Sequence, residues 1–504
     1  MNKLMYSAPL YFIIFLPVVV VLYQLCPQKF RKYILLLANY AFFYIWSKFF
    51  LVYQVITMVI TYVSSKIIDH TLNKKTKKFI LFLAIVINLG VLVILKYTNF
   101  LGENIFAIFH QRFTTVHFIT PIGISYYTLQ MISYLMDISS GKIHADHSIV
   151  DFAVYASFFP TLIQGPITRF NEIKDSILAC NPITYQNLKF GSQRILFGLM
   201  KKMIIADRLD PAVSKIFTSY TQDGLFSLIG AVLCTIQLYM DFSGIVDICL
   251  GSAEIFGIKL PENFRQPFFA ENASDFWRRW HITLGTFLRD YVFYPISLAK
   301  PTRRLSKFFT KHFGKAAGKF IGPLIALFAV WFLNGLWHGP YWSYIFYGLY
   351  YFYFMVLEIL LKKPVDDFLK KHQIDNNHTG LRIFRFVKLF IIVIIGELFF
   401  RAKTLAVGWT MFSSIFTNFH LSTLKDTLPF LRLDMIDWSI VIVGIVIIFL
   451  VDFYKEFYGS IRNAIELKPT WIRWSIIYTC IFALLIFGAY GPGYDIVAMI
   501  YAEF

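Results

Sequence analysis

The sequence predicts an all-α protein that crosses a membrane many times. Of its residues, 57% are apolar, 19% are aromatic and only 15% are charged, whereas soluble domains are about 45–50% apolar and 25% charged. Apolar stretches of close to 20 residues, enough to cross a hydrocarbon core of about 30 Å, recur along the whole chain. We therefore expect one integral-membrane domain over residues 1–504, a helical bundle with about 10–14 spans.

The first spans follow one another closely. The apolar stretch at about Ala8–Leu25 has the look of a signal peptide, but no small-x-small cleavage site follows it and more apolar segments come directly after. We interpret it as a span. The next crossings are expected at about Ile34–Phe50, Leu51–Ser65 and Phe79–Lys96.

Basic residues are concentrated in a few connecting segments. The net charge is +18, which in a membrane protein indicates loops that face anionic lipid rather than nucleic acid. By the positive-inside rule we place three basic segments in the cytoplasm: Lys66–Lys78, Lys300–Lys319 and Lys362–Lys388. Counting spans outward from them puts both termini outside, including the tail at residues 490–504, which has no Lys or Arg.

Two segments cannot be simple spans. Ser274–Ile296 carries three arginines and two aspartates among aromatic residues, so we expect it to be interfacial or re-entrant, packed within the bundle. Phe320–Leu361 would be about 63 Å long as one helix, twice the thickness of the hydrocarbon core. Proline restrains the residue before it and removes a backbone hydrogen bond, so a break is expected at Gly339-Pro340.

This predicted break places His338 inside a membrane protein, next to broken backbone. Imidazole has an ordinary pKa near 6.5, so it can stay neutral when buried and still accept a proton. It is then a candidate general base for a hydroxyl that attacks a thioester. A buried neutral histidine can equally be a structural hydrogen-bonding group. The same two interpretations apply to His281, while Arg278 and Arg279 either bind anionic phosphates or mark a cytoplasmic interface.

Other chemistries lack their motifs. The chain has no G-x-S-x-G, no phosphate-binding G-x-x-x-x-G-K-[ST], no H-E-x-x-H and no dinucleotide-binding G-x-G-x-x-G after a strand. The five cysteines are far apart and form no C-x-x-C, so neither a zinc site nor a disulfide framework is indicated. We expect no metal and no permanently bound cofactor.

"FWRRWHITLGTFLRDYVFYPI" with His281 and, 57 residues later, "NGLWHG" with His338 belong to a set of five segments. These two resemble the signature blocks of the membrane-bound O-acyltransferase family, in the bacterial branch of the alginate O-acetyltransferase membrane subunit and its cell-wall-acetylating relatives. The other three segments are "FFPTLIQGPITRF", "YMDFSGIVDICLGSAEIFGIKLPENFRQPF" and "GELFFRAKTLAVGWTMF". The resemblance covers a core at about residues 158–412.

The resemblance implies a helical bundle around a central tunnel. His338 would be the essential histidine and His281 the supporting one, with Asn334, Trp337 and Trp280 beside them. The family transfers an acyl group from a cytoplasmic thioester, here acetyl-coenzyme A or a similar donor, to a hydroxyl. This branch delivers the group outward across the bacterial plasma membrane to a polysaccharide acceptor, through an external acyltransferase of the SGNH type.

The last six residues, "MIYAEF", resemble the aromatic C-terminal motif of this branch. Tyr501 would be the residue that carries the acyl group briefly before the external enzyme takes it. Ala502 and Glu503 depart from the more aromatic versions of the motif, and an interfacial aromatic anchor is the alternative interpretation.

Three alternative functions stay open at this point. The acyl group is either acetyl or D-alanyl, as in the more distantly related D-alanyl transfer to teichoic acid. In a transporter or channel, His338 would belong to a proton or anion pathway. A non-catalytic subunit that only recruits the external enzyme would tolerate every histidine substitution.

Overall fold

The computed structural model describes residues 6–118, 120–145, 147–219 and 222–490. Within these ranges the chain is helical without a strand, and the one β-type pairing is an isolated antiparallel bridge between Phe264 and Trp280. The predicted all-α class is therefore confirmed. The described residues form two compact units, and α11 (Gly224–Ile255) contributes its first part to unit 2 and the rest to unit 1. That the chain is a single domain stays a prediction.

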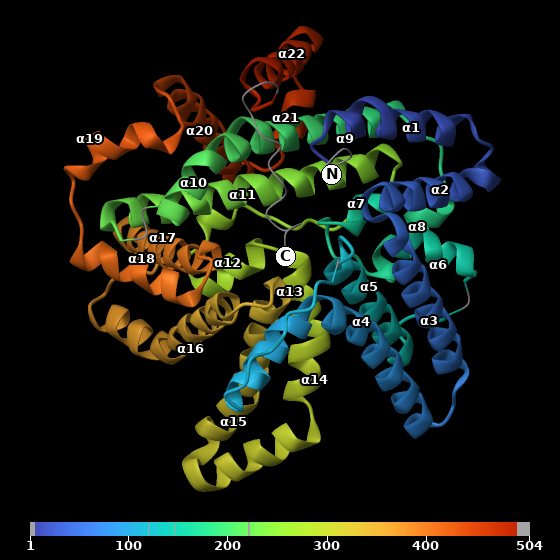
Figure 1. Ribbon diagram of the computed structural model, residues 1–504, viewed down its shortest axis with the longest axis horizontal. Helices are drawn as coiled ribbons and strands as arrows, with labels where there is room; N and C mark the ends of the chain where they lie inside the picture. The colour runs from blue at the N-terminus through green and yellow to red at the C-terminus, as the bar shows by residue number, and fades with distance from the viewer. Residues whose placement is uncertain (1–5, 119, 146, 220–221, 491–504) are drawn as a thin grey trace. The chain divides into compact units, whose positions relative to one another are not determined.

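Unit 1 holds the described residues up to Lys202 together with Phe242–Glu262. Its long helices α3, α4 and α5 pack against one another, as Figure 1 shows. Its helices, besides the end of α11, are a π-helical turn Tyr11–Phe15, α1 Leu16–Leu25, α2 Gln28–Ser47, a 3-10 turn Lys48–Phe50, α3 Leu51–His70, α4 Lys74–Ile108, α5 Ile124–Ser139, α6 Ile149–Ala156, α7 Phe159–Leu162, α8 Phe170–Ala179 and α9 Tyr185–Leu199.

Unit 2 holds the described residues of 203–241 and 263–490. A π-helical segment, Met200–Ala206, leads into it from unit 1. Its other elements, besides the start of α11, are α10 Asp207–Ser219, a 3-10 turn Pro267–Phe269, α12 Ala273–Arg279, α13 Ile282–Leu288, a π-helical turn Arg289–Phe293, α14 Tyr294–Ser297, α15 Lys300–His338, α16 Trp342–Lys371, α17 Thr379–Arg401, α18 Leu405–Thr417, α19 Thr423–Thr427, a 3-10 turn Leu428–Leu431, α20 Met435–Phe457, α21 Ile461–Glu466 and α22 Thr470–Phe487.

Seven helices among the described residues are long and apolar enough to cross a membrane. They are Gln28–His70, Lys74–Ile108, Gly224–Ile255, Lys300–His338, Trp342–Lys371, Met435–Phe457 and Thr470–Phe487. The first of these contains both α2 and α3, which are separated at Lys48, where φ is 45°. The predicted crossings near residues 34–50 and 51–65 are thus two distinct helices. Because shorter apolar helices such as Leu405–Thr417 also occur, the predicted total of spans stays a prediction.

The long apolar run of residues 320–361 is broken where the sequence predicts. Helix α15 ends at His338, Gly339 follows in an extended conformation, and α16 begins at Trp342. Helix α15 contains another break, before this apolar run, that the sequence analysis missed. At Gly314, where φ is 88°, the basic segment at residues 300–319 turns back on itself as a helical hairpin instead of forming a loop.

Helices α15 and α16 pack against each other (Figure 1), and two glycines bring their backbones into contact. A Cβ atom at Gly335 would lie 2.3 Å from the carbonyl oxygen of Tyr344, and one at Gly348 would lie 2.2 Å from that of Trp331. No side-chain rotation can relieve a clash with a backbone oxygen. The two glycines therefore fix how closely α16 approaches the end of α15, where His338 lies.

We predict that Gly335→Ala lowers the thermal midpoint of the detergent-solubilised protein. The added methyl must push α15 and α16 apart, and overpacking of this kind costs about 1–3 kcal/mol. Gly90→Ala is the matched control, because Gly90 also lies inside a long helix and a Cβ there meets nothing within 4 Å. The control should melt at or slightly above the wild-type temperature. Equal midpoints for the two variants would contradict the close crossing.

Candidate active site

His338 is the last residue of α15 and is 2% exposed. Aromatic rings surround its imidazole. The ring centroids of Trp337, Tyr347 and Phe400 lie 5.1, 5.9 and 5.2 Å from that of the imidazole, with interplanar angles of 75°, 90° and 90°. These rings come from α15, α16 and α17. The end of α15 is therefore enclosed by the next two helices of the chain, α16 and α17.

Asn334 lies one helical turn before His338 and therefore on the same face of α15. Its side chain is 4% exposed, and Oδ1 accepts no hydrogen bond within the part of the chain that the structure describes. Buried polar atoms are normally paired with protein, water or a ligand. An unpaired oxygen beside His338 is therefore a candidate contact for a substrate.

His281 is held in an unusual backbone conformation between α12 and α13. Its φ is 47° and its ψ is 49°, in the left-handed region that residues other than glycine rarely adopt. Backbone hydrogen bonds on both sides hold it there: Ile282 N donates to Asn263 O at 3.0 Å, and Arg265 N donates to Arg279 O at 2.9 Å. The segment predicted to fold back thus forms short helices with His281 at the turn between the first two.

The side chain of Asn263 fixes the imidazole of His281. Its Oδ1 accepts hydrogen bonds from Thr283 N at 3.0 Å and Thr283 Oγ1 at 2.9 Å, and it lies 3.2 Å from His281 Nδ1. Because a backbone N–H donates to this atom, it is the amide oxygen and can only accept. His281 Nδ1 must therefore carry the proton, so the lone pair of the neutral ring is on Nε2.

Burial determines the charge state of His281. The residue lies outside the seven apolar helices, and burial lowers its pKa to about 3 because a charged ring would lose its hydration. The Asn263 amide adds no charge that would offset this. His281 is therefore neutral at physiological pH, with Nε2 as a hydrogen-bond acceptor.

Trp337 connects the two histidines. The centroid of its ring is 5.5 Å from that of His281 and 5.1 Å from that of His338. Two histidines 57 positions apart in the sequence thus both contact one indole. The structure brings together His338, His281, Asn334 and Trp337, and their role as site residues stays a prediction.

The other predicted residues lie around this group in different surroundings. Arg278 is exposed. Arg279 forms ion pairs with Asp275, at 3.1 Å, and with Glu456 of α20, at 2.9 Å. Trp280 is buried, and its ring packs against those of Tyr239, Phe264 and Phe276. Tyr501 lies outside the described residues.

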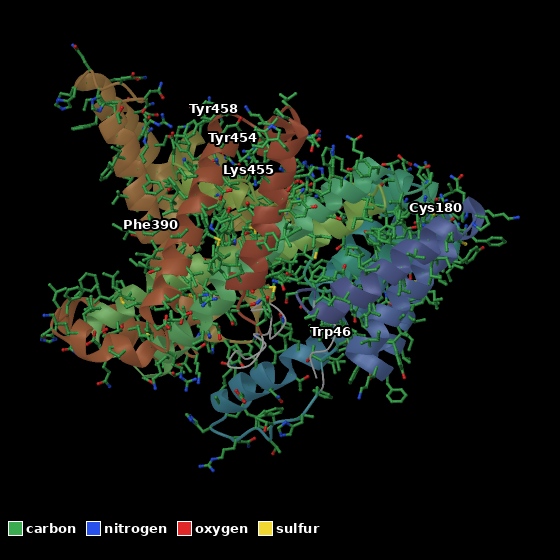
Figure 2. The ribbon with its side chains drawn as sticks, turned by 90° about the horizontal axis from the view of Figure 1, so that it is seen from above. Trp46, Cys180, Phe390, Tyr454, Lys455 and Tyr458 are labelled. Carbon is green, nitrogen blue, oxygen red and sulfur yellow. The ribbon has the colours of Figure 1, made fainter. Side chains whose placement is uncertain are left out.

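The end of α20 anchors the segment that carries His281. Figure 2 labels Tyr454, Lys455 and Tyr458 close together at this end of the helix. From the same two turns, Glu456 binds Arg279, and Asp452 Oδ2 accepts a hydrogen bond of 2.6 Å from Tyr239, which packs on Trp280. These contacts explain how Arg279 and Trp280 hold the turn at His281 in place.

Sequence reasoning missed three residues of this site. Asn263 lies in one of the segments that carry the family resemblance, but it is a single polar residue in a loop and nothing in the sequence marks it as a partner of His281. Tyr347 is one of many aromatic residues in α16. Glu397, whose Oε1 accepts a hydrogen bond of 3.0 Å from the hydroxyl of Tyr347, is the one with a signal: it is the single acidic residue in the 23 residues of α17, and an isolated acid in an apolar helix is a functional candidate.

Comparison with known proteins identifies the family. The model of the membrane-bound O-acyltransferase family matches residues 139–400, just over half of the chain. The chain belongs to this family. It is an O-acyltransferase and a multi-pass membrane protein.

Three relatives are similar over most of their length. The probable alginate O-acetylase AlgI of Pseudomonas aeruginosa is 33% identical, over 82% of this chain and 75% of the relative. The protein of the same name in Pseudomonas putida is 29% identical over 96% of both chains. The peptidoglycan O-acetyltransferase of Helicobacter pylori is 32% identical, over 69% of this chain and 68% of the relative.

We predict that Asn263→Leu destabilises the protein strongly. The change keeps the approximate size but removes the oxygen that accepts from Thr283 N, Thr283 Oγ1 and His281 Nδ1, and each stranded buried donor costs about 1–3 kcal/mol. The measurement is the thermal midpoint in detergent. Thr235→Val is the control, because this buried hydroxyl donates only to Ala231 O within its own helix. If the two variants had the same thermal midpoint, Asn263 would not be the anchor of His281.

Proposed function

We propose that this protein transfers acetyl groups from a cytoplasmic acyl thioester, such as acetyl-coenzyme A, toward a polysaccharide outside the cell. The observation that carries the proposal is the buried imidazole of His338 at a helix break, in a chain that belongs to an O-acyltransferase family. The choice of acetyl is supported by the names of the relatives, which act on alginate and peptidoglycan.

His338 acts as the general base. It removes the proton from the acceptor hydroxyl, and the oxygen attacks the carbonyl carbon of the thioester. The tetrahedral intermediate then collapses: the C–S bond breaks, the new C–O bond remains as an ester, and the thiolate takes the proton from the imidazolium. Proton transfer of this kind contributes about 10²–10⁴ in rate.

The neighbours of His338 orient the reactants. Asn334 Oδ1 accepts a hydrogen bond from the incoming hydroxyl or from the donor, and Asn263 keeps the imidazole of His281 in a fixed orientation next to Trp337. The aromatic rings around His338 limit the access of water, which would otherwise hydrolyse the thioester. Trp337 contacts both histidines.

The direction of transfer follows from the charge distribution. In this proposal the basic segments at residues 66–78, 300–319 and 362–388 face the cytoplasm of a bacterial cell, near the plasma-membrane surface, where they attract the phosphates of the donor. Both termini then face outside. There the tail presents Tyr501 as an acyl relay to an external acyltransferase of the SGNH type, which selects the final polysaccharide.

We predict that His338→Ala lowers the release of free coenzyme A from acetyl-coenzyme A by about 10²–10⁴ at unchanged expression. His372→Ala is the matched control, because His372 is exposed at the end of α16; it should retain wild-type activity. The same assay with a D-alanyl thioester tests the identity of the acyl group. Wild-type turnover in His338→Ala would refute the role of this histidine, whereas no turnover in the wild-type protein itself would favour a recruiting subunit.

We predict that Tyr501→Phe abolishes acetylation of the C-terminal peptide, because the phenolic oxygen that would carry the ester is gone. The measurement is mass spectrometry of this peptide after incubation with acetyl-coenzyme A in the absence of the external enzyme. Tyr494→Phe, a second tyrosine of the tail, should leave the acetylated peptide unchanged. Secreted polysaccharide that is fully acetylated in cells with Tyr501→Phe would exclude the relay.

A further inference from the structure

The first part of α15 is a helical arm of its own. It begins at Lys300 and ends at Gly314, where φ is 88° and the chain turns back into the long part of α15 (Figure 1). At 1.5 Å per residue the arm is about 21 Å long, too short for a hydrocarbon core of about 30 Å. The long part, from Lys315 to His338, is about 36 Å long and can cross the membrane. We call residues 300–319 the basic hairpin.

Small residues close the basic hairpin. A Cβ at Gly318 would lie 2.8 Å from the backbone oxygen of Ser306, and one at Gly322 would lie 3.2 Å from the hydroxyl oxygen of Ser306. Thr302 and Thr310, one turn before and after Ser306, lie at the same two glycines. Residues four positions apart share one face of a helix. Thr302, Ser306 and Thr310 therefore form the face by which the arm packs on the long part of α15.

Two further faces of the arm are turned away from this contact. At 3.6 residues per turn, the cations of the arm fall in one sector: Lys300, Arg303, Arg304, Lys307 and Lys311. The next sector holds four apolar residues and a histidine: Pro301, Leu305, Phe308, Phe309 and His312. All five cations are exposed, and Leu305 and Phe308 are 38% and 51% exposed. A helix with a basic face beside an apolar face is typical of the membrane interface.

The basic hairpin concentrates positive charge. Lys315 and Lys319 join the five cations of the arm, and none of the seven forms an ion pair within the ranges that the structure describes. No Asp or Glu occurs between residues 290 and 358 of the sequence, whereas each of the other two basic segments contains at least one aspartate. Like charges four residues apart destabilise a helix, and Arg303, Lys307 and Lys311 are spaced in this way. The surface therefore favours an anionic partner.

Anionic phospholipid fits both exposed faces of the arm. Its headgroup phosphate suits the lysines and arginines, and the apolar face of an interfacial helix reaches the boundary of the acyl chains. The phosphates of a soluble thioester donor would engage the cations alone and leave Leu305 and Phe308 in water. The arm is also continuous with a helix long and apolar enough to cross the membrane, which places it within reach of the lipid surface.

We propose that the basic hairpin is a binding surface for anionic phospholipid. The arm lies in the membrane interface, with its cations on the headgroups and its apolar face toward the acyl chains. Because α15 ends at His338, the bound lipid also fixes the depth of the candidate base in the membrane. In the proposed function this segment attracts the donor from a distance, whereas its direct contacts are with lipid. Lipid binding itself does not depend on the proposed acyl transfer.

The test is the triple variant Arg304→Gln, Lys307→Gln and Lys311→Gln of the full chain in detergent. The measurement is the affinity for the first bound phosphatidylglycerol, by native mass spectrometry during a lipid titration, with phosphatidylcholine as the reference lipid without net charge. Each lysine or arginine at an anionic surface contributes about fivefold to binding. The affinity for phosphatidylglycerol should therefore fall at least about tenfold, while that for phosphatidylcholine stays the same.

The matched control is the triple variant Lys362→Gln, Lys363→Gln and Lys370→Gln. It removes the same net charge from the exposed end of α16, where Asp366 and Asp367 lie between the lysines, and it should bind phosphatidylglycerol like the wild type. All six altered cations are exposed, so the thermal midpoints without added lipid should be equal for the wild type and both variants.

Phe308→Ser tests the apolar face of the arm, because it changes no charge. Its affinity for phosphatidylglycerol should fall at least about threefold, since a half-exposed phenylalanine loses its contact with the acyl chains. Leu72→Ser is the control, because Leu72 is an exposed apolar residue in the loop between α3 and α4, next to other lysines. It should bind phosphatidylglycerol like the wild type.

The outcomes separate lipid from the other anionic partners. Equal affinity for phosphatidylglycerol in the wild type and the hairpin triple variant overturns the inference; a raised KM for acetyl-coenzyme A in that variant would then assign the cations to the donor, and an unchanged KM to an acidic protein. Loss of binding in the triple variant but not in Phe308→Ser overturns the interfacial placement of the arm. Failure of the proposed function, seen as no release of coenzyme A by the wild type, leaves these binding results unaffected.

Discussion

The site depends on the requirement that every backbone polar group within a membrane protein be satisfied, which confines irregular backbone to places enclosed by protein. Both histidines lie at such places. His338 is at the end of α15, and His281 is in a left-handed turn between α12 and α13. The turn at His281 exists because Asn263 supplies both backbone and side-chain partners for it. The end of α15 and the turn before α13 therefore also determine how the two imidazole rings are oriented.

Close contacts between neighbouring helices give these interruptions a defined geometry. Gly335 and Gly348 let α15 and α16 meet at their backbones, and Gly396 lets α17 approach Tyr351. Without a Cβ at these positions, van der Waals packing rather than hydrophobic burial can hold the helices together, as expected in lipid. The rings around His338 come from three helices, so their positions depend on both crossings.

The sequence predicts well what depends on local composition, and poorly what depends on contacts between distant residues. The break at Gly339-Pro340 is predictable because proline acts on its immediate neighbours. The break near Lys48 lies close to the predicted boundary between two crossings, whereas the break at Gly314 is not predicted, since it lies in a basic segment with no proline beside it. Asn263 binds a residue 18 positions away and Glu397 one 50 positions away, and no local pattern encodes such pairs. Of the predicted site, the group around Trp337 could be anticipated only through the family resemblance.

The different partners of the two histidines argue for different roles. Asn263 is neutral and binds His281 through a fixed oxygen, so it settles which nitrogen carries the proton without stabilising a charge. Burial then keeps the ring neutral, which suits a hydrogen-bond acceptor but not a group that must become cationic. His338 is equally buried, but it lies among the rings of Trp337, Tyr347 and Phe400, and aromatic rings attract a cation. The group that takes the proton is therefore better placed at the end of α15 than at the turn before α13.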